Sequence, residues 1–229
     1  MSPTVEGAVR TRAGGSLKLA IPRGALWEPT LDALDRIDVD TAEMRSNSRS
    51  LVFTSSANGA ELTLVTMRPS DVPTYVEAGA ADLGITGKDV LLEHSDRVVY
   101  EILDLDYGAC RMVLAAREGD QSLGESERRQ GAMRIATKYP RIAERHFEQT
   151  GRQAEVIEVK GSVELAPLVG LADGIVDLVA TGRTLKENGL EVREEIASSS
   201  ARLVANRVSH KLRAEEIDDL VERLRPGSS

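Results

Sequence analysis

The sequence contains one short unit twice. The segments ADLGITGKDVL (81–91) and VDLVATGRTL (176–185) both read Asp-Leu-x-x-Thr-Gly, followed by a Lys or Arg and a helical pattern. Asp82 and Asp177, which lead the two units, lie 95 residues apart. Each unit also follows a proline-containing helical segment that a serine opens. This repeat predicts two similar lobes, each with a strand that ends in a Thr-Gly turn.

Strand and helix patterns alternate along the rest of the chain. An Asn-Gly pair at 58–59 between two β-like runs predicts a hairpin. The alternation predicts an α/β protein with largely parallel sheets. We expect strands over 17–21, 50–54, 61–67, 81–85, 98–106, 109–116, 133–137, 155–159, 175–180, 191–196 and 200–206. We expect helices from just after Gly24 to about 36, over 70–79, 88–94, 139–151 and 213–225, and in the segment that ends near 171.

The last predicted helix has an apolar stripe of Ile217, Leu220, Val221 and Leu224. This stripe has two interpretations, docking onto its own lobe or a subunit contact.

Composition excludes several classes of protein. With 37 acidic against 29 basic residues, the formal charge of −8 disfavours nucleic acid, whose phosphates it would repel. Cys110 is the single cysteine, so no intrachain disulfide can form and a cytoplasmic location is expected. The chain shows neither an apolar leader nor a membrane-spanning run of about 18 residues. We expect residues 1–15 to be a disordered arm.

The second copy of the unit suggests binding of a sugar phosphate. Asp177 interrupts an apolar strand, and a carboxylate at such a position needs a partner. The Thr-Gly turn that follows offers backbone N–H groups to an anion. Each Thr-Gly turn alone can be an ordinary strand–helix connector, and Thr184 with Glu187 also fits a capping box.

The chain has no Walker A, no dinucleotide-binding glycine motif after its first strand, no nucleophile elbow and no cysteine-rich metal site.

Several long segments resemble the ATP phosphoribosyltransferase family, in order and over most of the chain. They are DVPTYVEAGAADLGITGKDVLLEH, RIATKYPRIAERHF, GSVELAPLVGLADGIVDLVATGRTLKENGL and SSSARLVAN. The resemblance implies a two-lobed fold like type II periplasmic binding proteins. It also implies a glycosyltransferase that opens histidine biosynthesis by joining N1 of ATP to C1 of 5-phosphoribosyl 1-diphosphate (PRPP). Diphosphate leaves with inversion, and Mg²⁺ accompanies the substrates. We expect one lobe over 16–107 plus 196–229 and a PRPP-binding lobe over 108–195.

The resemblance assigns roles to particular residues. The backbone of the 180–184 turn and its two threonine hydroxyls would hold the 5-phosphate, while Glu164 and Asp177 would bind the ribose hydroxyls. Arg49, and with it Arg23, would act as the catalytic cations on the departing diphosphate. The expected PRPP contacts are Glu164, Asp177, Ala180, Thr181, Gly182, Arg183 and Thr184. The expected ATP or diphosphate contacts are Arg23, Gly24, Gly84, Thr86, Gly87, Lys88 and Lys138, and no residue is assigned to a metal.

The chain departs from the family pattern at two positions. An arginine is common in the family where this chain has Ala25. The catalytic role of that missing arginine would therefore fall to Arg49 or Arg23. A small residue is common where this chain has Arg183, whose cation would either reach the phosphate or point outward.

Length suggests the short form of the family, without a C-terminal regulatory domain. The short form pairs with a regulatory subunit related to histidyl-tRNA synthetase in a hetero-octamer, and we expect a homodimer when the chain is alone. A solute-binding module with the same two-lobed plan is the main rival. A transferase with another base as nucleophile is a third possibility.

Overall fold

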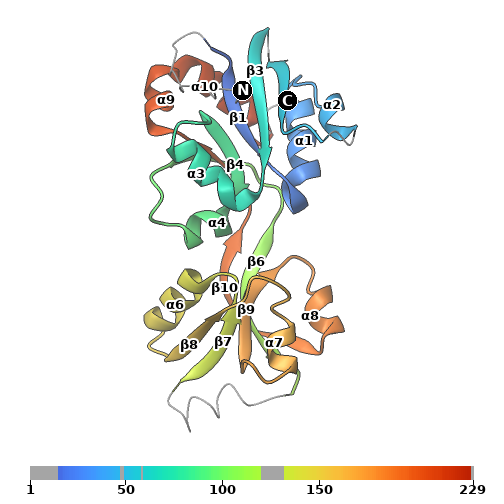
Figure 1. Cartoon of the computed structure of the whole chain (residues 1–229), viewed down its shortest axis with the longest axis vertical. Helices are drawn as coiled ribbons and strands as arrows, with labels where there is room; N and C mark the ends of the chain where they lie inside the picture. The colour runs from blue at the N-terminus through green and yellow to red at the C-terminus, as the bar shows by residue number, and fades with distance from the viewer. Residues whose placement is uncertain (1–14, 47–48, 58, 120–131, 228–229) are drawn as a thin grey trace, which may run out of the picture. The chain divides into compact units, whose positions relative to one another are not determined.

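The chain forms two compact units (Figure 1). The computed structural model describes residues 15–46, 49–57, 59–119 and 132–227. The first unit contains the described residues up to 86 together with 97–106 and those from 201, and the second contains 87–96 and 107–200. The expected arm over 1–15 lies outside the described residues except for Gly15.

Residues 87–96, expected within the 16–107 lobe, group with the second unit. Their hydrogen bonds explain this, because Lys88 and Asp89 bond to Ser200 and Ser199, and Glu93 bonds to the backbone at 141–142.

The first unit is built on a six-stranded sheet in the order β2-β3-β1-β4-β11-β5. Its strands are β1 Leu17–Pro22, β2 Val52–Ala57, β3 Ala60–Met67, β4 Leu83–Gly87, β5 Tyr100–Asp104 and β11 Ala201–Ala205. Its helices are α1 Trp27–Asp35, α2 Ala42–Arg45, α3 Val72–Glu77, α9 Arg207–Leu212 and α10 Ala214–Leu224, with short 3-10 turns over Gly24–Leu26 and Pro69–Asp71.

The second unit is built on a five-stranded sheet in the order β10-β6-β9-β7-β8. Its strands are β6 Cys110–Arg117, β7 Met133–Thr137, β8 Ala154–Glu158, β9 Gly174–Val179 and β10 Leu190–Ser199. Its helices are α4 Lys88–Glu93, α6 Pro140–Gln149, α7 Leu165–Leu168 and α8 Arg183–Glu187.

Both sheets are mixed, so the prediction of largely parallel sheets is wrong. β1 pairs in parallel with β3 and β4, and β7 pairs in parallel with β8 and β9. The hairpin β2–β3 is antiparallel, as are the pairs β5–β11, β6–β9 and β6–β10. Two of these strands, β6 and β11, lie where the chain enters or re-enters a unit. Strand β6 runs opposite to β9 and therefore also opposite to β7 and β8.

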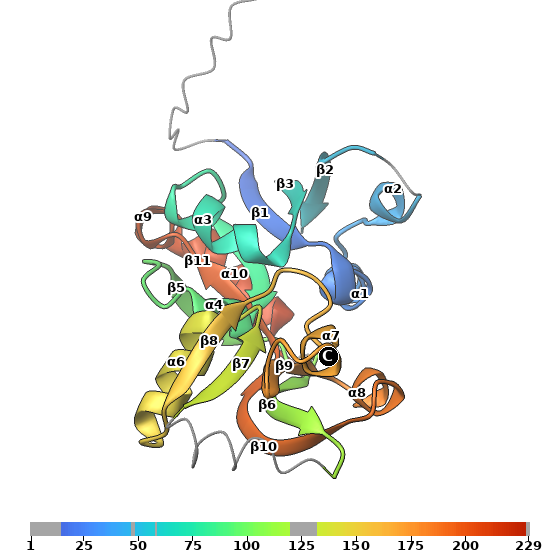
Figure 2. The same cartoon turned by 60° about the horizontal axis from the view of Figure 1, so that its bottom comes forward.

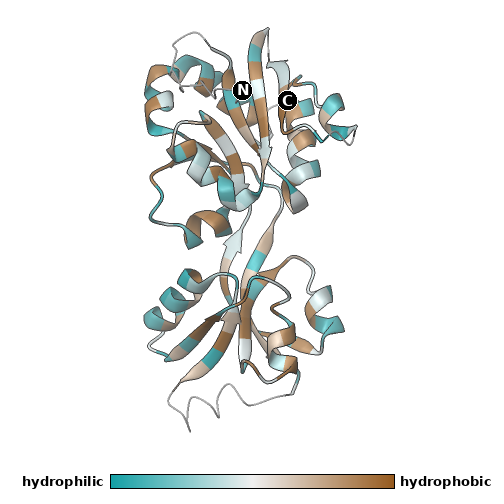
Figure 3. Ribbon diagram, in the orientation of Figure 1, coloured by the Kyte–Doolittle hydropathy of each residue, from teal (hydrophilic) through white to brown (hydrophobic). Residues whose placement is uncertain are grey.

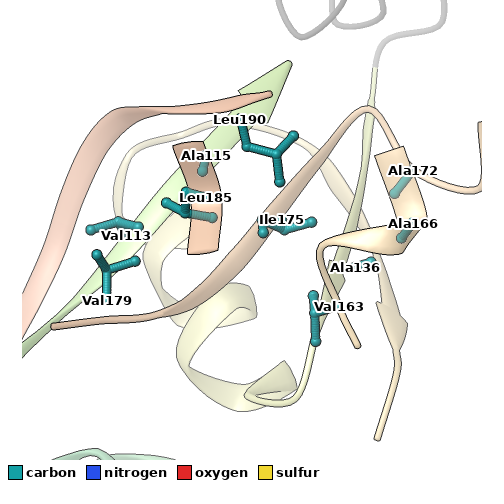
Figure 4. Packing of buried hydrophobic residues seen from close by; sticks show 10 residues of the cluster. All are labelled: Val113, Ala115, Ala136, Val163, Ala166, Ala172, Ile175, Val179, Leu185 and Leu190. Atoms are coloured by element: carbon teal, nitrogen blue, oxygen red, sulfur yellow. The ribbon is translucent and has the colours of Figure 1, made fainter. Parts of the chain in front are cut away.

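Helices cover both faces of the second sheet, and the side chains of its strands alternate between two cores. On β6, Val113 and Ala115 join a core with Leu185 of α8 and Ala166 of α7 (Figure 4). The intervening Met112 and Leu114 join a second core with Ile142 and Phe147 of α6. Figure 2 shows α6 and the pair α7 and α8 on opposite sides of this sheet.

The structure corrects the register of the internal repeat. Asp82 precedes β4, and its carboxylate accepts the N–H of Lys18 at the start of β1, while its own N–H bonds the Lys18 carbonyl. Asp173 precedes β9 and makes the same reciprocal pair with Arg134 at the start of β7. The counterpart of Asp82 is therefore Asp173, and Asp177 corresponds to Thr86.

The sequence alone suggested that Asp173 is a surface residue, and this prediction is wrong. Its side chain is only 8% exposed, because it pairs with the Arg134 guanidinium at 2.9 Å.

The end of the chain forms two helices where the sequence predicted one. Asn206 begins α9 by accepting the N–H groups of Val208 and Ser209, each at 2.9 Å. The apolar stripe of α10 is buried in its own unit at Ile217, Leu220 and Leu224, which favours docking over a subunit contact for that stripe. Figure 3 shows hydrophobic residues (brown) along the strands of both sheets and many hydrophilic residues (teal) on the helices.

Candidate functional site

A pocket lies at the carboxyl ends of three parallel strands in the second unit. Strands β8, β7 and β9 run in the same direction, so the segments that follow them meet at one edge of the sheet. Lys138 follows β7, the 180–184 turn follows β9, and Glu164 begins α7. The cavity measures about 280 Å³ and is lined by Lys138, Glu164, Asp177, Leu178, Val179, Ala180, Thr181, Gly182, Arg183, Thr184 and Leu185.

Strand pleating turns Asp177 toward this pocket. Ile175 and Val179, two residues to either side, both belong to the core beneath α7 and α8. Asp177 therefore lies on the same face of β9 as these two residues, and it lines the cavity at the end of the strand. Asp177 is half-buried, and its Oδ1 accepts the Leu178 N–H at 2.9 Å.

The surroundings of Asp177 act on its charge in opposite directions. Burial raises the pKa of Asp177 above its ordinary value, and the neighbouring Glu164 carboxylate raises it further. The Lys138 ammonium and the Leu178 N–H lower the same pKa, because both favour the carboxylate. An acid whose pKa is shifted in this way and that lines a pocket is a candidate for a functional role.

The turn after β9 keeps its backbone open toward this pocket. Gly182 has a left-handed backbone with φ of 77°, and a side chain there would meet only Val179 Cγ1 at 3.9 Å. The Arg183 N–H makes only a long 3.4 Å contact with Thr181 Oγ1. Thr181 and Thr184 are both exposed, so their hydroxyls are open to a ligand. A second hollow on the outer side of the turn is lined by Thr181, Gly182, Arg183, Lys186 and Glu187.

The first copy of the Thr-Gly unit is closed by the chain itself. The Thr86 hydroxyl donates to the Pro69 carbonyl at 2.8 Å, and Thr86 is fully buried. The Lys88 N–H donates to the Ser200 carbonyl, and Asp89 Oδ1 lies where a side chain on Gly87 would go. This turn thus has fewer open donors than the turn at 180–184.

Packing also accounts for Gly84. A Cβ on this residue would lie 2.4 Å from Val72 Cγ1, so glycine lets α3 approach β4. The roles expected for Gly84, Thr86, Gly87 and Lys88 as ATP or diphosphate contacts stay predictions, and Lys88 is the half-exposed member of the four.

Arg23 and the Arg49 segment lie together in the first unit, at the carboxyl end of β1. The Arg23 guanidinium donates to Thr66 Oγ1 at 2.9 and 3.1 Å and to the Ser50 carbonyl at 3.2 Å. It also lies 5.1 Å from the ring centre of Trp27. Arg49 is exposed, next to Ser50. Gly24, with φ of 83°, and Ala25 are both exposed beside Arg23.

The structure brings the expected PRPP residues of the second unit around one cavity. It adds Leu178, Val179 and Leu185 to the lining, and it places Lys138 beside Asp177. The parallel pairing of β7 with β9, in which Thr137 is in register with Val176, brings Lys138 next to Asp177.

No group of three or more His, Cys, Asp or Glu side chains in the described part of the chain has the arrangement of a metal site. No described helix is both long and apolar enough to cross a membrane.

Comparison with known proteins identifies the family. The HisG family, described as ATP phosphoribosyltransferase, matches residues 68–226, which is more than half of the chain. The chain belongs to the ATP phosphoribosyltransferase family. It is therefore a pentosyl-transferring enzyme, which transfers the phosphoribosyl group of PRPP to ATP in the first step of histidine biosynthesis.

Curated relatives of the family are similar over nearly their whole length. The ATP phosphoribosyltransferase of Rubrobacter xylanophilus is 53% identical over 90% of this chain and 93% of its own. That of Ruminiclostridium cellulolyticum is 47% identical over 91% of this chain and 95% of its own. With 229 residues, the chain has the length of these relatives, consistent with the short form of the family.

Solved structures agree with the two-lobed fold. The chain is 38% identical to a chain of the ATP phosphoribosyltransferase HisG:HisZ complex from Thermotoga maritima, with a TM-score of 0.73 over 91% of this chain and 96% of that one. The BvgS VFT2 domain of Bordetella pertussis has a TM-score of 0.59 over 93% of this chain and 88% of its own, at 11% identity, which shows a likeness of fold alone.

Proposed function

We propose that the pocket of the second unit is the PRPP site of this transferase. The 5-phosphate would lie at the 180–184 turn, held by backbone N–H groups and by the hydroxyls of Thr181 and Thr184. The observation that carries this proposal is that Lys138, two acids and the open turn line a single cavity. Gly182 supports it, because a residue without a Cβ lets the phosphate approach the backbone closely.

The ribose hydroxyls would donate hydrogen bonds to Asp177 and Glu164. A carboxylate accepts such bonds most strongly when it is ionised. Lys138 favours the ionised form of Asp177, and bound hydroxyls would do the same, offsetting the cost of its burial. The ligand would thus supply hydrogen-bond donors to Asp177, which is half-buried and has few such donors within the protein. Arg183 is exposed at the rim of the same cavity and would add a cation to the phosphate.

In the transfer step, N1 of the ATP adenine attacks C1 of PRPP as the bond from C1 to the diphosphate oxygen breaks. Negative charge grows on the diphosphate and positive charge on the ribosyl carbon. Arg49 and Arg23 would stabilise the departing diphosphate, and removal of one such contact typically costs about 3–4 kcal/mol of barrier. Arg23 is held in place by Thr66, Ser50 and Trp27, whereas Arg49 is exposed and has room to bind.

ATP is proposed to contact the first of the repeated turns and the end of β1. Lys88 and Gly24 are the accessible members of the expected set there. No general base is required, because N1 of adenine already carries the lone pair that attacks.

Mg²⁺ is proposed to arrive with the substrates. The oxygen ligands near the pocket are the carboxylates of Asp177 and Glu164, and this donor set fits a Mg²⁺ ion that is held mainly by substrate phosphates and water. When bound, the ion would neutralise phosphate charge, while Asp177 and Glu164 orient the ribose.

The assembly and location are also proposals. The similar Thermotoga maritima chain was solved in a HisG:HisZ complex, which supports a regulatory partner subunit for this chain too. We propose a hetero-octamer with a subunit related to histidyl-tRNA synthetase, a homodimer in its absence, and a cytoplasmic location.

The proposed site is tested by following phosphoribosyl-ATP formation in the ultraviolet, with ATP, PRPP and Mg²⁺ present. Arg49→Ala is expected to lower kcat by at least tenfold while the melting temperature is retained. Arg45→Ala is a matched control, since Arg45 pairs with Glu28, Asp32 and Asp35 on the surface of the same unit. A wild-type kcat for Arg49→Ala would remove this residue from the site.

A further inference from the structure

Tyr139 is a half-buried tyrosine to which the proposed transfer step gives no role. It directly follows Lys138, between the end of β7 and the start of α6. Its ring packs against the core of the second unit that contains Ile142 and Phe147. A phenylalanine would fill that place equally well, so packing does not explain the hydroxyl. When a tyrosine is buried, its hydroxyl usually has a hydrogen-bond partner.

The partner of this hydroxyl is the carboxylate of Asp89, in the first turn of α4. Burial raises the pKa of the Tyr139 phenol above its ordinary value, and the Asp89 charge raises it further. The phenol therefore keeps its proton and donates it to Asp89. The carboxylate is itself fixed, because its Oδ1 accepts the Ser199 hydroxyl at 2.9 Å, while the Asp89 N–H donates to Ser199 Oγ at 3.0 Å.

A second acid of α4 holds the same segment of chain. Glu93 lies one helical turn after Asp89, so both side chains are on one face of the helix. The Glu93 carboxylate accepts the N–H groups of Arg141 and Ile142, each at 3.0 Å. Helix α4 thus contacts the start of α6 at two points, and all of these residues belong to the second unit.

The residue before Lys138 is tied to the sheet. The Thr137 hydroxyl donates to the Val176 carbonyl of β9 at 2.6 Å and accepts the Tyr139 N–H at 2.9 Å. Lys138 lies between these two anchored residues, and its exposed side chain lines the pocket together with Asp177. A cation whose backbone is already fixed loses less freedom when it binds a ligand.

We propose that Tyr139 is a positioning residue of the PRPP pocket and that it acts through Lys138. The hydrogen bond from its hydroxyl to Asp89 fixes the direction in which Lys138 leaves the sheet, and so keeps the ammonium beside Asp177. Without this bond, Glu93 still holds the start of α6, but the Lys138 segment gains freedom and its ammonium spends less time in the pocket. The inference rests on the proposed PRPP site and adds to it a residue that acts from outside the cavity lining.

Tyr139→Phe tests the hydroxyl alone, because the ring keeps its place in the core. In a calorimetric titration of the full chain with PRPP and Mg²⁺, we expect the Kd to rise at least about fivefold, which is part of the worth of a hydrogen bond to a charged group. The melting temperature shows whether the variant is folded. Tyr75→Phe is the matched control, since Tyr75 is 46% exposed on α3 of the first unit, and its Kd for PRPP should equal that of wild type.

The double variant with Lys138→Ala separates positioning from a general effect on the fold. Lys138→Ala removes the cation itself and should raise the Kd for PRPP at least about tenfold. Adding Tyr139→Phe to it should change the Kd less than about twofold, because residues that act through one another are not additive. A Tyr139→Phe chain that binds PRPP like wild type, or a double variant whose two effects multiply, would overturn the inference. A wild-type Kd for Lys138→Ala would overturn the proposed PRPP contacts as well.

The pH dependence supplies a readout that a purely structural role would not move. The groups that face Asp177 are Lys138 after β7, Glu164 before α7, Arg183 of α8 and the phenol of Tyr139. The Lys138 ammonium lowers the pKa of Asp177, so a displaced ammonium lets that pKa rise. Tyr139→Phe and Lys138→Ala should therefore both move the acidic limb of kcat/KM for PRPP to higher pH. An acidic limb that moves in Lys138→Ala and stays in place in Tyr139→Phe would contradict the positioning role.

Discussion

Asp173 and Asp177 show how two acids in one segment can serve different ends. Asp173 pairs through both oxygens with the backbone and guanidinium of Arg134 and thereby joins the start of β9 to β7. Asp177 accepts the Leu178 N–H and faces the pocket with Lys138 and Glu164. The first acid has its partners within the fold, whereas the second lines the pocket that we propose binds PRPP.

Asp177→Asn is expected to lower kcat/KM for PRPP at least tenfold, which is about 1.4 kcal/mol, because the amide is a weaker acceptor for the ribose hydroxyls. The same variant should melt no lower than wild type at pH 7. The pKa of Asp177 is raised in the folded state, so the stability that its neutral form contributes is lost as pH rises through that pKa. The amide stays neutral throughout, and the gain in melting temperature over wild type should grow with pH and then level off.

Asp173→Asn is the control for this experiment. It should lower the free energy of unfolding by about 1–3 kcal/mol, since it weakens a charge-assisted contact to Arg134. Its effect on the KM for PRPP should be small. The account of the two acids is wrong if Asp173→Asn loses activity at full stability, or if Asp177→Asn unfolds the chain.

Gly182 offers a second test at the scale of one residue. Gly182→Ala forces a Cβ into a left-handed backbone, which costs about 1 kcal/mol of stability, and places that Cβ where the phosphate would approach. We expect the KM for PRPP to rise at least tenfold. Gly189→Ala is matched to it, with φ of 63° and open space around it, and should cost similar stability with no change in KM. Equal KM values for the two variants would contradict the phosphate position.

At the scale of elements, most strands and helices could be predicted from local patterns, and the register of the repeat could not. By sequence similarity, Asp82 corresponds to Asp177. In the structure, Asp82 corresponds instead to Asp173, because Asp82 bonds to Lys18 in the same way as Asp173 bonds to Arg134. These are contacts between distant segments, which a local pattern does not contain. The antiparallel strands β6 and β11 were misjudged for the same reason. Helix α9 was missed because its apolar residues face outward, so it lacks the buried stripe that predicts a helix.

The candidate site, like the strands and helices, could be predicted from the sequence only in part. The residues from 177 to 184 come from one stretch of sequence, so a single motif finds them all. Lys138 and Glu164 join them through the parallel pairing of β7, β8 and β9, which only the fold supplies. The closure of the first Thr-Gly turn by Pro69 and Ser200 likewise depends on segments far away in the chain.

Glu93 provides a test at the element scale. Its carboxylate, only 7% exposed, accepts the N–H groups of Arg141 and Ile142, each at 3.0 Å, and so satisfies the first turn of α6. Glu93→Ala should lower the free energy of unfolding by about 1–3 kcal/mol in urea denaturation, since two N–H groups lose their acceptor. Asp96→Ala removes an exposed ion pair to the same Arg141 and should cost less than about 1 kcal/mol. Equal costs for the two variants would argue against the cap.

At the scale of the whole molecule, we propose that an acidic chain binds two highly charged anions through a few local cations. Arg23 and Arg49 belong to the first unit, and Lys138 and Arg183 to the second. The net charge of −8 is an average over the whole chain, and it does not exclude local cations beside the proposed anion sites. The division of labour follows from this distribution, with the second unit proposed to hold the sugar phosphate and the first to supply the arginines.

The most direct test is a crystal structure of this chain with PRPP and Mg²⁺. We expect the 5-phosphate within hydrogen-bond distance of the backbone N–H groups at 180–184, and the ribose hydroxyls on Asp177 and Glu164. A well-defined PRPP molecule whose 5-phosphate lies elsewhere, with the 180–184 turn in contact with water alone, would contradict the account.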